Sequence, residues 1–373
     1  MTTTKTIDRQ SGFTLIEMLV AMAITLILIA GTLGLFESAT RANEAGTQLA
    51  NLNQNLRTGM NLVIRDLLQT GQGIPTGGIP IPNGLGILPI NRPSPPGQNY
   101  TFPPAYLNMP AIVPGAVMGP NNANTLGVPT DMITLFYADA TLPLTSPPVG
   151  NNPPTSQFVV LAANGSTITV DPANPISGAG VNNPIIPGDI IMITCPNGSR
   201  MQTVTAVNGQ TITFNTNDPL QLNQRGAPSG SIMDLVATCG APQPPNPSNY
   251  TALRINMFTY YLNTTARARI PRLMRQYNFP GVNNPARSVA EVIENLQITF
   301  DFENGTVNPL LIDIKGDPPT LNALGVSENQ IRKVNLFMAG RSDQPYSKTQ
   351  QYFRNSLETQ VSLRSLSFVS QYQ

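Results

Sequence analysis

The sequence predicts an α+β protein, with one long N-terminal hydrophobic helix packed on an antiparallel β-sheet head that carries inserted hairpins. Three observations predict this class. A strongly apolar run occupies residues 13–36, and apolar side chains then recur at helical spacing as far as Leu67. From residue 131 onward the pattern changes to short runs of β-branched and aromatic residues, separated by Asn-Gly and Pro-Gly turns.

The composition excludes several classes of function. The chain has 373 residues, 21 Lys and Arg against 20 Asp and Glu, and no His. Without His there can be no Ser-His-Asp or Cys-His hydrolase and no His-ligated metal site. We therefore expect no catalytic residues, no metal and no cofactor, so the protein is not predicted to be an enzyme. A net charge of +1 also argues against a nucleic-acid partner.

The apolar run from Phe13 to Phe36 is long enough, at 1.5 Å per residue, to cross the ~30 Å hydrocarbon layer of a bilayer. Lys5 and Arg9 precede it, which places the short N-terminal segment in the cytoplasm and the rest of the chain outside. Glu17 is the charged residue within the run. Because an unpaired carboxylate in lipid is costly, Glu17 is predicted to be functional and to need a partner.

Residues Ser11-Gly12-Phe13-Thr14-Leu15-Ile16-Glu17, followed by an apolar helix, resemble the class III signal of type IV prepilins and type II secretion pseudopilins. The resemblance implies a pilin-like fold and cleavage by a prepilin peptidase between Gly12 and Phe13, with residues 1–12 as the leader. It also implies N-methylation of Phe13 and pairing of Glu17 with a terminal ammonium during assembly, residues 13–36 forming the filament-core helix. The alternative is an ordinary signal anchor with a stray Glu. Many major pilins carry Pro late in this run, where this chain has Gly31 and Gly34.

An amphipathic helix is predicted over 37–70, ending near Leu68, where Gly71, Gly73 and Pro75 follow. Its apolar stripe should pack on a β-sheet, and a soluble coiled coil is the alternative. Residues 71–130 are dense in Pro, Gly and Asn, which predicts an irregular loop packed over the head or a partly disordered arm. The stripe consists of Leu49, Leu52, Leu56, Met60, Val63 and Leu67.

Residues 131–373 are predicted to form the β-rich head. Two hairpins are expected at Asn164-Gly165 and Asn208-Gly209. Both turns begin the pattern Asn-Gly-x-Thr-Ile-Thr, for which common turn chemistry is a simpler explanation than duplication. A short helix is predicted over Ser288–Glu294 from its Ser-x-x-Glu start. Further strands are predicted at Asp131–Tyr137, Phe158–Leu161, Thr167–Val170, Asp189–Ile193, Gln202–Thr205, Thr211–Phe214, Met257–Leu262, Leu296–Phe302, Val334–Met338 and Val361–Leu366.

Several of these later segments resemble the PilW-type minor pilin family. They are Gly188-Asp189 with its strand, Tyr260-Tyr261 followed by Leu273-Met274-Arg275, Val292–Gln297 and Thr359–Arg364. The resemblance implies a minor pilin that primes filament assembly in a tip complex, together with other minor pilins and the major pilin. Such a protein spans the inner membrane once before assembly, with its head in the periplasm, and later lies in the pilus at the cell surface. Two alternatives are a J-like type II secretion pseudopilin and a membrane-anchored adhesin or binding protein that never assembles.

Three groups of residues outside the N-terminal motif could form sites. Cys195 and Cys239 lie in the part of the chain placed outside the membrane, so a disulfide between them is predicted, with two unpaired thiols as the alternative. Asp301–Gly305 faintly resembles a calcium loop, but a strand ending in an Asn-Gly turn is the better interpretation. A basic cluster could contact an acidic partner pilin or a nucleic-acid backbone, although a solvated or salt-bridged face is favoured. The cluster consists of Arg267, Arg269, Arg272 and Arg275.

Overall fold

The computed structural model describes residues 12–121, 129–143, 159–170, 175–178, 181–240, 250–264, 270–281, 284–305 and 326–367. These residues belong to two compact units. The first comprises the described part of Met1–Asn51 together with Ser342–Phe353, and the second comprises the described parts of Leu52–Arg341 and Arg354–Gln373. The prediction of an α+β protein with a long N-terminal helix and antiparallel sheets is confirmed.

Helix α1 runs from Leu15 to Gln69. Its buried residues lie in the second unit and repeat at spacings of three and four, so they form one face. The predicted stripe is therefore confirmed from Leu52 to Leu67, whereas Leu49 is partly exposed. The helix ends as predicted, because Gly71 adopts the left-handed conformation (φ 83°) that side chains disfavour. The buried residues are Leu52, Leu56, Gly59, Met60, Val63, Asp66 and Leu67.

A seven-stranded antiparallel sheet forms the centre of the second unit. Its longest strand, β13 (Thr251–Asn263), pairs along one edge with β6 (Met132–Pro143). Along the other edge it pairs first with β9 (Ile190–Cys195) and then with β14 (Arg272–Tyr277). The remaining strands are β5 (Ile112–Gly115) beside β6, β10 (Gly198–Thr203) beside β9, and β15 (Arg287–Glu291) beside β14.

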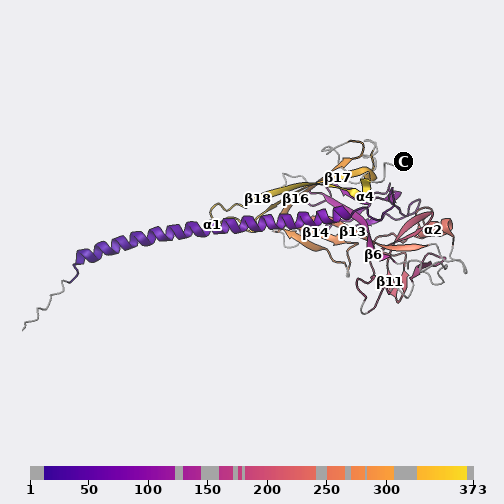
Figure 1. Ribbon diagram of the computed structural model, residues 1–373, viewed down its shortest axis with the longest axis horizontal. Coiled ribbons are helices and arrows are strands. Elements are labelled where there is room, and N and C mark those ends of the chain that lie inside the picture. The colour runs from indigo at the N-terminus through magenta and orange to yellow at the C-terminus, as the bar shows by residue number, and fades with distance from the viewer. Residues whose placement is uncertain are drawn as a thin grey trace, which may run out of the picture. The chain divides into compact units, whose positions relative to one another are not determined.

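A second sheet has the order β16-β17-β18, with bounds Ile293–Phe302, Ile331–Arg341 and Arg354–Ser362. The two sheets meet α1 at Gly59. A Cβ atom added there would lie 3.0 Å from Ala290 of β15, 3.2 Å from Leu273 of β14 and 3.3 Å from Met338 of β17. The predicted packing of the helix on β-sheets is confirmed, and Figure 1 shows the C-terminal part of α1 alongside β13, β14 and β17.

The two predicted Asn-Gly turns belong to one four-stranded sheet of order β11-β12-β8-β7. Strands β7 (Val159–Leu161) and β8 (Thr167–Val170) flank the first turn, and β11 (Ala206–Asn208) and β12 (Thr211–Thr213) flank the second. The two copies of Thr-Ile-Thr pair with each other, so that Ile168 lies opposite Ile212. This sheet shares a hydrophobic core with β9 and helix α2 (Ile232–Cys239).

The Pro- and Gly-rich segment after α1 is packed on the sheet where the structure describes it. It contributes buried apolar residues, among them Ile79, Phe102 and Met109, to a core shared with β6, β9 and β13. Its regular structure is limited to β5 and to two-residue strands. These are β1 (Ile79–Pro80) with β4 (Asn108–Met109), and β2 (Asn91–Arg92) with β3 (Tyr100–Thr101).

Two predicted elements are wrong. Ser288–Glu294 forms β15 and the start of β16 instead of a helix, because Ser288 pairs with Met274 of β14 and Val292 (φ 58°) kinks the chain between the strands. Val361–Leu366 is strand only to Ser362. The Leu363 N–H still donates to the Arg332 carbonyl of β17 at 2.9 Å, and helix α4 (Arg364–Ser367) then replaces the predicted end of the strand. Strand β17 itself follows the 3₁₀ turn η1 (Glu328–Gln330).

For the second hairpin, the predicted turn is confirmed, but the predicted first strand, Gln202–Thr205, is wrong. Gln202 and Thr203 belong to β10, which pairs with β9 rather than with β12. The amide of Asn223 binds both backbone groups of Thr203 and so ends β10 there. The other predicted strands are observed at or near their expected positions, except that Phe158 lies outside the described residues.

Candidate functional site

The residues of the predicted processing site lie at the start of the described chain. Gly12 is exposed, and Phe13 is 83% exposed, immediately before α1. Ser11 and the rest of the leader lie outside the described residues. The bond between Gly12 and Phe13 therefore precedes the helix, in backbone without regular secondary structure that helical hydrogen bonds do not protect.

Thr14 and Glu17 form a reciprocal cap at the N-terminus of α1. The backbone N–H and the hydroxyl of Thr14 each donate to Glu17 Oε2 at 2.9 Å, and the Glu17 N–H donates to Thr14 Oγ1 at 3.4 Å. This is a capping box, which satisfies orphan donors of the first helical turn. The Thr-x-x-Glu pattern is visible in the sequence, but the partner predicted for Glu17 was a terminal ammonium of another subunit. Within one chain, Thr14 is the partner of Glu17.

The first part of α1 carries a continuous apolar surface. Large side chains from Leu15 to Phe36 are each about half or more exposed, for example Ile16 (69%) and Phe36 (72%). The helix is long and apolar enough to cross a membrane, with a mean hydropathy of 2.5 over its most apolar stretch. A helix near the N-terminus with these properties is typical of both membrane anchors and signal sequences.

Comparison with protein families shows which kind of N-terminal helix this is. Residues 7–33 match the prokaryotic N-terminal methylation motif. The chain therefore carries a prepilin-like methylation motif at its N-terminus. Its motif implies processing by a prepilin peptidase and anchoring in a membrane before assembly. No curated protein and no solved structure matches the chain.

The prepilin-type motif and the fold agree. A long N-terminal apolar helix packed against antiparallel sheets is a pilin-like architecture. Proteins of this class belong to type IV pili and type II secretion systems and are generally structural rather than enzymatic. The motif covers only the N-terminal part of the chain, so the PilW-like resemblance of the head stays a prediction.

A buried ionic cluster joins the second part of α1 to the head. Asp66 on α1 is fully buried. It accepts hydrogen bonds from Tyr260 Oη of β13 at 2.6 Å and from Arg275 Nε of β14 at 2.7 Å. The guanidinium carbon of Arg275 also lies 3.5 Å from the centre of the Phe258 ring. Burial and the neighbouring Asp66 charge raise the pKa of Tyr260, so its hydroxyl remains a donor at neutral pH.

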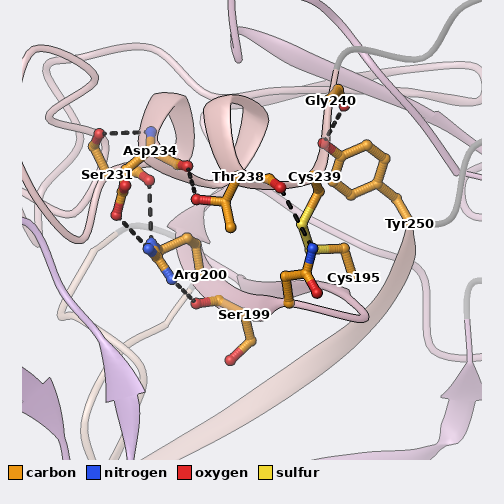
Figure 2. The surroundings of a disulfide bond; sticks show 10 residues. Cys195, Ser199, Arg200, Ser231, Asp234, Thr238, Cys239, Gly240 and Tyr250 are labelled. Carbon is orange, nitrogen blue, oxygen red and sulfur yellow. Dashed lines mark hydrogen bonds and ion pairs between the residues drawn. A yellow bond between two sulfur atoms is a disulfide. The ribbon is translucent and has the colours of Figure 1, made fainter.

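The structure joins Cys195 and Cys239 by a disulfide, with the two Cα atoms 6.5 Å apart. Figure 2 shows that it links the end of β9 to the last residue of α2. Tyr250 Oη donates to the carbonyl of Gly240, just past this helix end, at 2.7 Å. The bridge therefore fastens α2 to β9, and β9 in turn pairs with β13 of the central sheet.

The other end of α2 is fixed by polar contacts. Ser231 caps the helix, its hydroxyl accepting from the Asp234 N–H at 3.2 Å (Figure 2). Arg200 of β10 pairs with Asp234 and donates from Nε to the Ser231 carbonyl at 3.2 Å. The hydrogen bond from Arg200 lowers the pKa of Asp234. Neither the Ser231 cap nor the Arg200 pair was predicted from the sequence, although Ser231 followed by Asp234 is a recognisable cap signal.

The two remaining candidate groups have structural contacts. Asp301 accepts from Asn335 and Gln360, Glu303 pairs with Arg332, and Gly305 closes a turn (φ 86°) after β16, as the turn interpretation predicts. In the basic cluster, Arg272 pairs with Glu291 and Arg275 with Asp66. Arg267 and Arg269 lie outside the described residues. Within the described parts of the chain, no group of three His, Cys, Asp or Glu side chains could hold a metal ion.

Proposed function

We propose that this prepilin-type protein is a minor pilin, which joins other minor pilins in a tip complex and primes assembly of a type IV pilus after a prepilin peptidase removes residues 1–12. One observation carries the proposal: the methylation motif over residues 7–33 leads directly into α1, which continues without a break to Gln69. A cleaved secretory signal would separate from the head, whereas here the apolar helix and the head share one element.

The apolar surface of α1 supports the assembly step. Side chains from Leu15 to Phe36 are exposed in the single chain, and in water such a continuous patch is unfavourable. The membrane covers this surface before assembly, and helices of other subunits cover it afterwards. In this proposal Phe13 becomes the methylated N-terminus, and the Glu17 carboxylate pairs with the terminal ammonium of a neighbouring subunit.

This pairing has a physical reason. A carboxylate and an ammonium that enter an apolar environment together relieve each other's desolvation, whereas either group alone is strongly disfavoured there. The Thr14 cap supplies hydrogen bonds to Glu17 but no positive charge. A charged partner is therefore still needed once the helix lies among other apolar helices.

The structure of the head supports a role as a minor pilin rather than as the repeating major pilin. Besides the sheets that pack on α1, it carries an inserted module of four strands, whose hydrophobic core is shared with β9 and α2. Such an insertion is tolerated most easily at a filament end, where a subunit has fewer neighbours. We place the protein as a single-pass inner-membrane protein with a periplasmic head before assembly, and in the surface pilus afterwards. Its partners are then the prepilin peptidase, other minor pilins and the major pilin, without nucleic acid.

Mass spectrometry of sheared surface filaments tests this proposal. We expect a peptide that begins at N-methylated Phe13, in much smaller amount than the major pilin. Recovery of functional protein that still carries Met1 through Gly12 would contradict it.

A deletion strain separates the two machines that use this motif. If the protein is a minor pilin, surface filaments disappear and secretion of folded proteins continues. Loss of secretion with normal pili would instead assign it as a type II secretion pseudopilin.

A further inference from the structure

A half-open cavity of about 460 Å³ lies on the face of the seven-stranded sheet beside α1. Side chains from β13, β14 and β15 line it, together with residues from the connections before β9 and before β15. Its volume falls within the ~300–1,000 Å³ that is common for small-molecule sites. Neither the prepilin motif nor the proposed filament role uses this cavity.

The acidic groups that line the cavity are already occupied. The Asp139 carboxylate receives a hydrogen bond from Arg254 Nη2 at 2.6 Å. Asp189 accepts from the Ile186 N–H at 3.1 Å and from Tyr277 Oη at 3.3 Å, and Arg254 Nη1 lies 3.6 Å from it. These contacts satisfy the carboxylates from within the head, so a ligand would meet little free negative charge here.

The hydrogen-bond donors of the cavity are not all used. Arg275 donates from Nε to Asp66 and Tyr260 and its guanidinium lies over the Phe258 ring, but among the described residues its two terminal nitrogens have no hydrogen-bond acceptor. Arg287 is exposed, and no described residue pairs with it. The side-chain amides of Asn256 and Asn284 likewise line the cavity without a partner in the described chain.

Two guanidinium groups with free nitrogens match a carboxylate, which arginine binds through paired hydrogen bonds. The two amides can each donate and accept, which matches the hydroxyl groups of a sugar. The volume is far larger than one acidic side chain of a peptide would fill. We propose that this cavity binds an acidic sugar, with its carboxylate toward Arg275 and Arg287 and its hydroxyls toward Asn256 and Asn284.

The test uses the full-length protein in detergent micelles, with glucuronate and glucose as probes and saturation-transfer NMR and calorimetry as readouts. Glucuronate should bind with a Kd near the millimolar range, and glucose should not bind detectably. Arg287→Ala should weaken glucuronate binding about tenfold or more, through the loss of a charge-assisted hydrogen bond. Arg287 is exposed, so its replacement should not disturb folding.

Arg57→Ala is the matched control, because Arg57 is also an exposed arginine but lies on α1 away from the cavity lining. It should bind glucuronate like the unaltered protein. The proposal fails if glucuronate does not bind, if glucose binds equally well, or if Arg287→Ala and Arg57→Ala behave alike. It also fails if a glutamate-containing peptide binds more tightly than glucuronate. These outcomes are independent of filament assembly.

Discussion

Asp66 is fully buried on a face of α1 that otherwise carries apolar side chains such as Met60 and Val63. A carboxylate at such a position is costly unless hydrogen bonds and an opposite charge compensate it. Tyr260 and Arg275 supply both. The contact therefore gives specificity as well as stability, because it fixes which turn of α1 faces β13 and β14.

Replacing Asp66 by Asn should destabilise the head by about 3–5 kcal/mol, since it leaves the partly buried Arg275 without its counter-charge. Glu291→Gln is the control, because it breaks the more exposed pair with Arg272 and should cost less than about 1 kcal/mol. Guanidinium unfolding followed by tyrosine fluorescence would measure both variants. Equal effects of the two substitutions would contradict the role of Asp66.

Glu328 gives a pH-dependent contribution to stability. It is buried and accepts a hydrogen bond from Tyr106 Oη, and burial raises the pKa of its carboxyl. A carboxyl whose pKa is higher in the folded state binds its proton more tightly there. Its destabilising effect is therefore largest at neutral pH and decreases as the pH falls through the folded pKa toward the ordinary value.

We therefore expect Glu328→Gln to raise the free energy of unfolding at pH 7, and this gain to shrink as the pH is lowered toward 4.5, the ordinary glutamate pKa. Denaturant titrations at a series of pH values provide the measurement. A constant difference between Glu328→Gln and the unaltered protein across this range would rule out the expected linkage.

At the level of residues, the sequence indicates local contacts far better than distant ones. The cap of Thr14 and Glu17 spans three positions and follows a known pattern, so it could have been predicted. Tyr260 lies 194 positions from Asp66, and nothing in the spacing of either residue identifies the other. Long-range polar pairs depend on the sheet register, which a single sequence does not specify.

The contact between α1 and the two sheets depends on a small residue. Gly59 lies at the closest approach, where a Cβ atom would already be 3.0 Å from the Ala290 side chain. Glycine weakens an isolated helix by about 1 kcal/mol relative to alanine. Its use at this position is explained by packing, because a larger side chain would separate the helix from β14, β15 and β17.

Gly59→Leu should therefore destabilise the head by about 1–3 kcal/mol through overpacking. Gly46→Leu is matched to it, since Gly46 is in the same helix with nothing within 4 Å of an added Cβ atom. That change should leave the head unaffected and increase helix stability slightly. Thermal unfolding monitored by circular dichroism would compare the two variants, and a similar loss in both would disprove the packing explanation.

The disulfide between Cys195 and Cys239 spans 44 positions. Cross-linking a loop of this length restricts the unfolded chain and is worth about 4 kcal/mol in the chain-entropy model. The double variant Cys195→Ser, Cys239→Ser should lose stability of this order. Adding a reductant should lower the unfolding midpoint of the unaltered protein and leave the double variant unchanged. Equal sensitivity of both proteins to reductant would contradict a stabilising bridge.

Predictions of whole elements succeeded where one pattern dominated and failed where tertiary pairing overrode it. The periodic stripe of α1 was sufficient to predict the helix and its sheet-facing side. Ser288–Glu294 has the Ser-x-x-Glu signal of a helix start, yet its backbone is used in the ladder with β14. The partner strand lies outside any local window, so local propensity gave the wrong answer there.

At the scale of the whole molecule, the chain combines an N-terminal motif that matches a known model with a head that matches no curated protein or solved structure. The prepilin-like N-terminal motif and the fold class were therefore predictable from sequence. The cavity beside α1 was not, because it requires residues from α1, four strands and two connections to meet. Glu17 and the head also belong to different compact units, so their roles can be tested separately.

Glu17→Gln and Glu17→Ala should both prevent incorporation into filaments while leaving the unfolding midpoint of the head unchanged. Glutamine keeps an acceptor for the Thr14 cap and lacks the charge, so it separates capping from ion pairing. Immunoblots of sheared filaments and unfolding curves of the purified proteins provide the two measurements. Normal incorporation of Glu17→Gln would show that the cap is sufficient and that no ammonium partner is required.

The connection Ser342–Phe353 between β17 and β18 covers one side of α1 before the helix reaches the head. The Ser347 N–H and hydroxyl both donate to the Glu44 carboxylate, at 3.2 and 2.6 Å, and Arg41, Ala45 and Gln48 on the same side are only partly exposed. Ala42, Gly46 and Ala50 on the opposite side are exposed. The helix thus has one shielded flank and one bare flank of small side chains, and a neighbouring molecule can come close to the backbone only from the bare one.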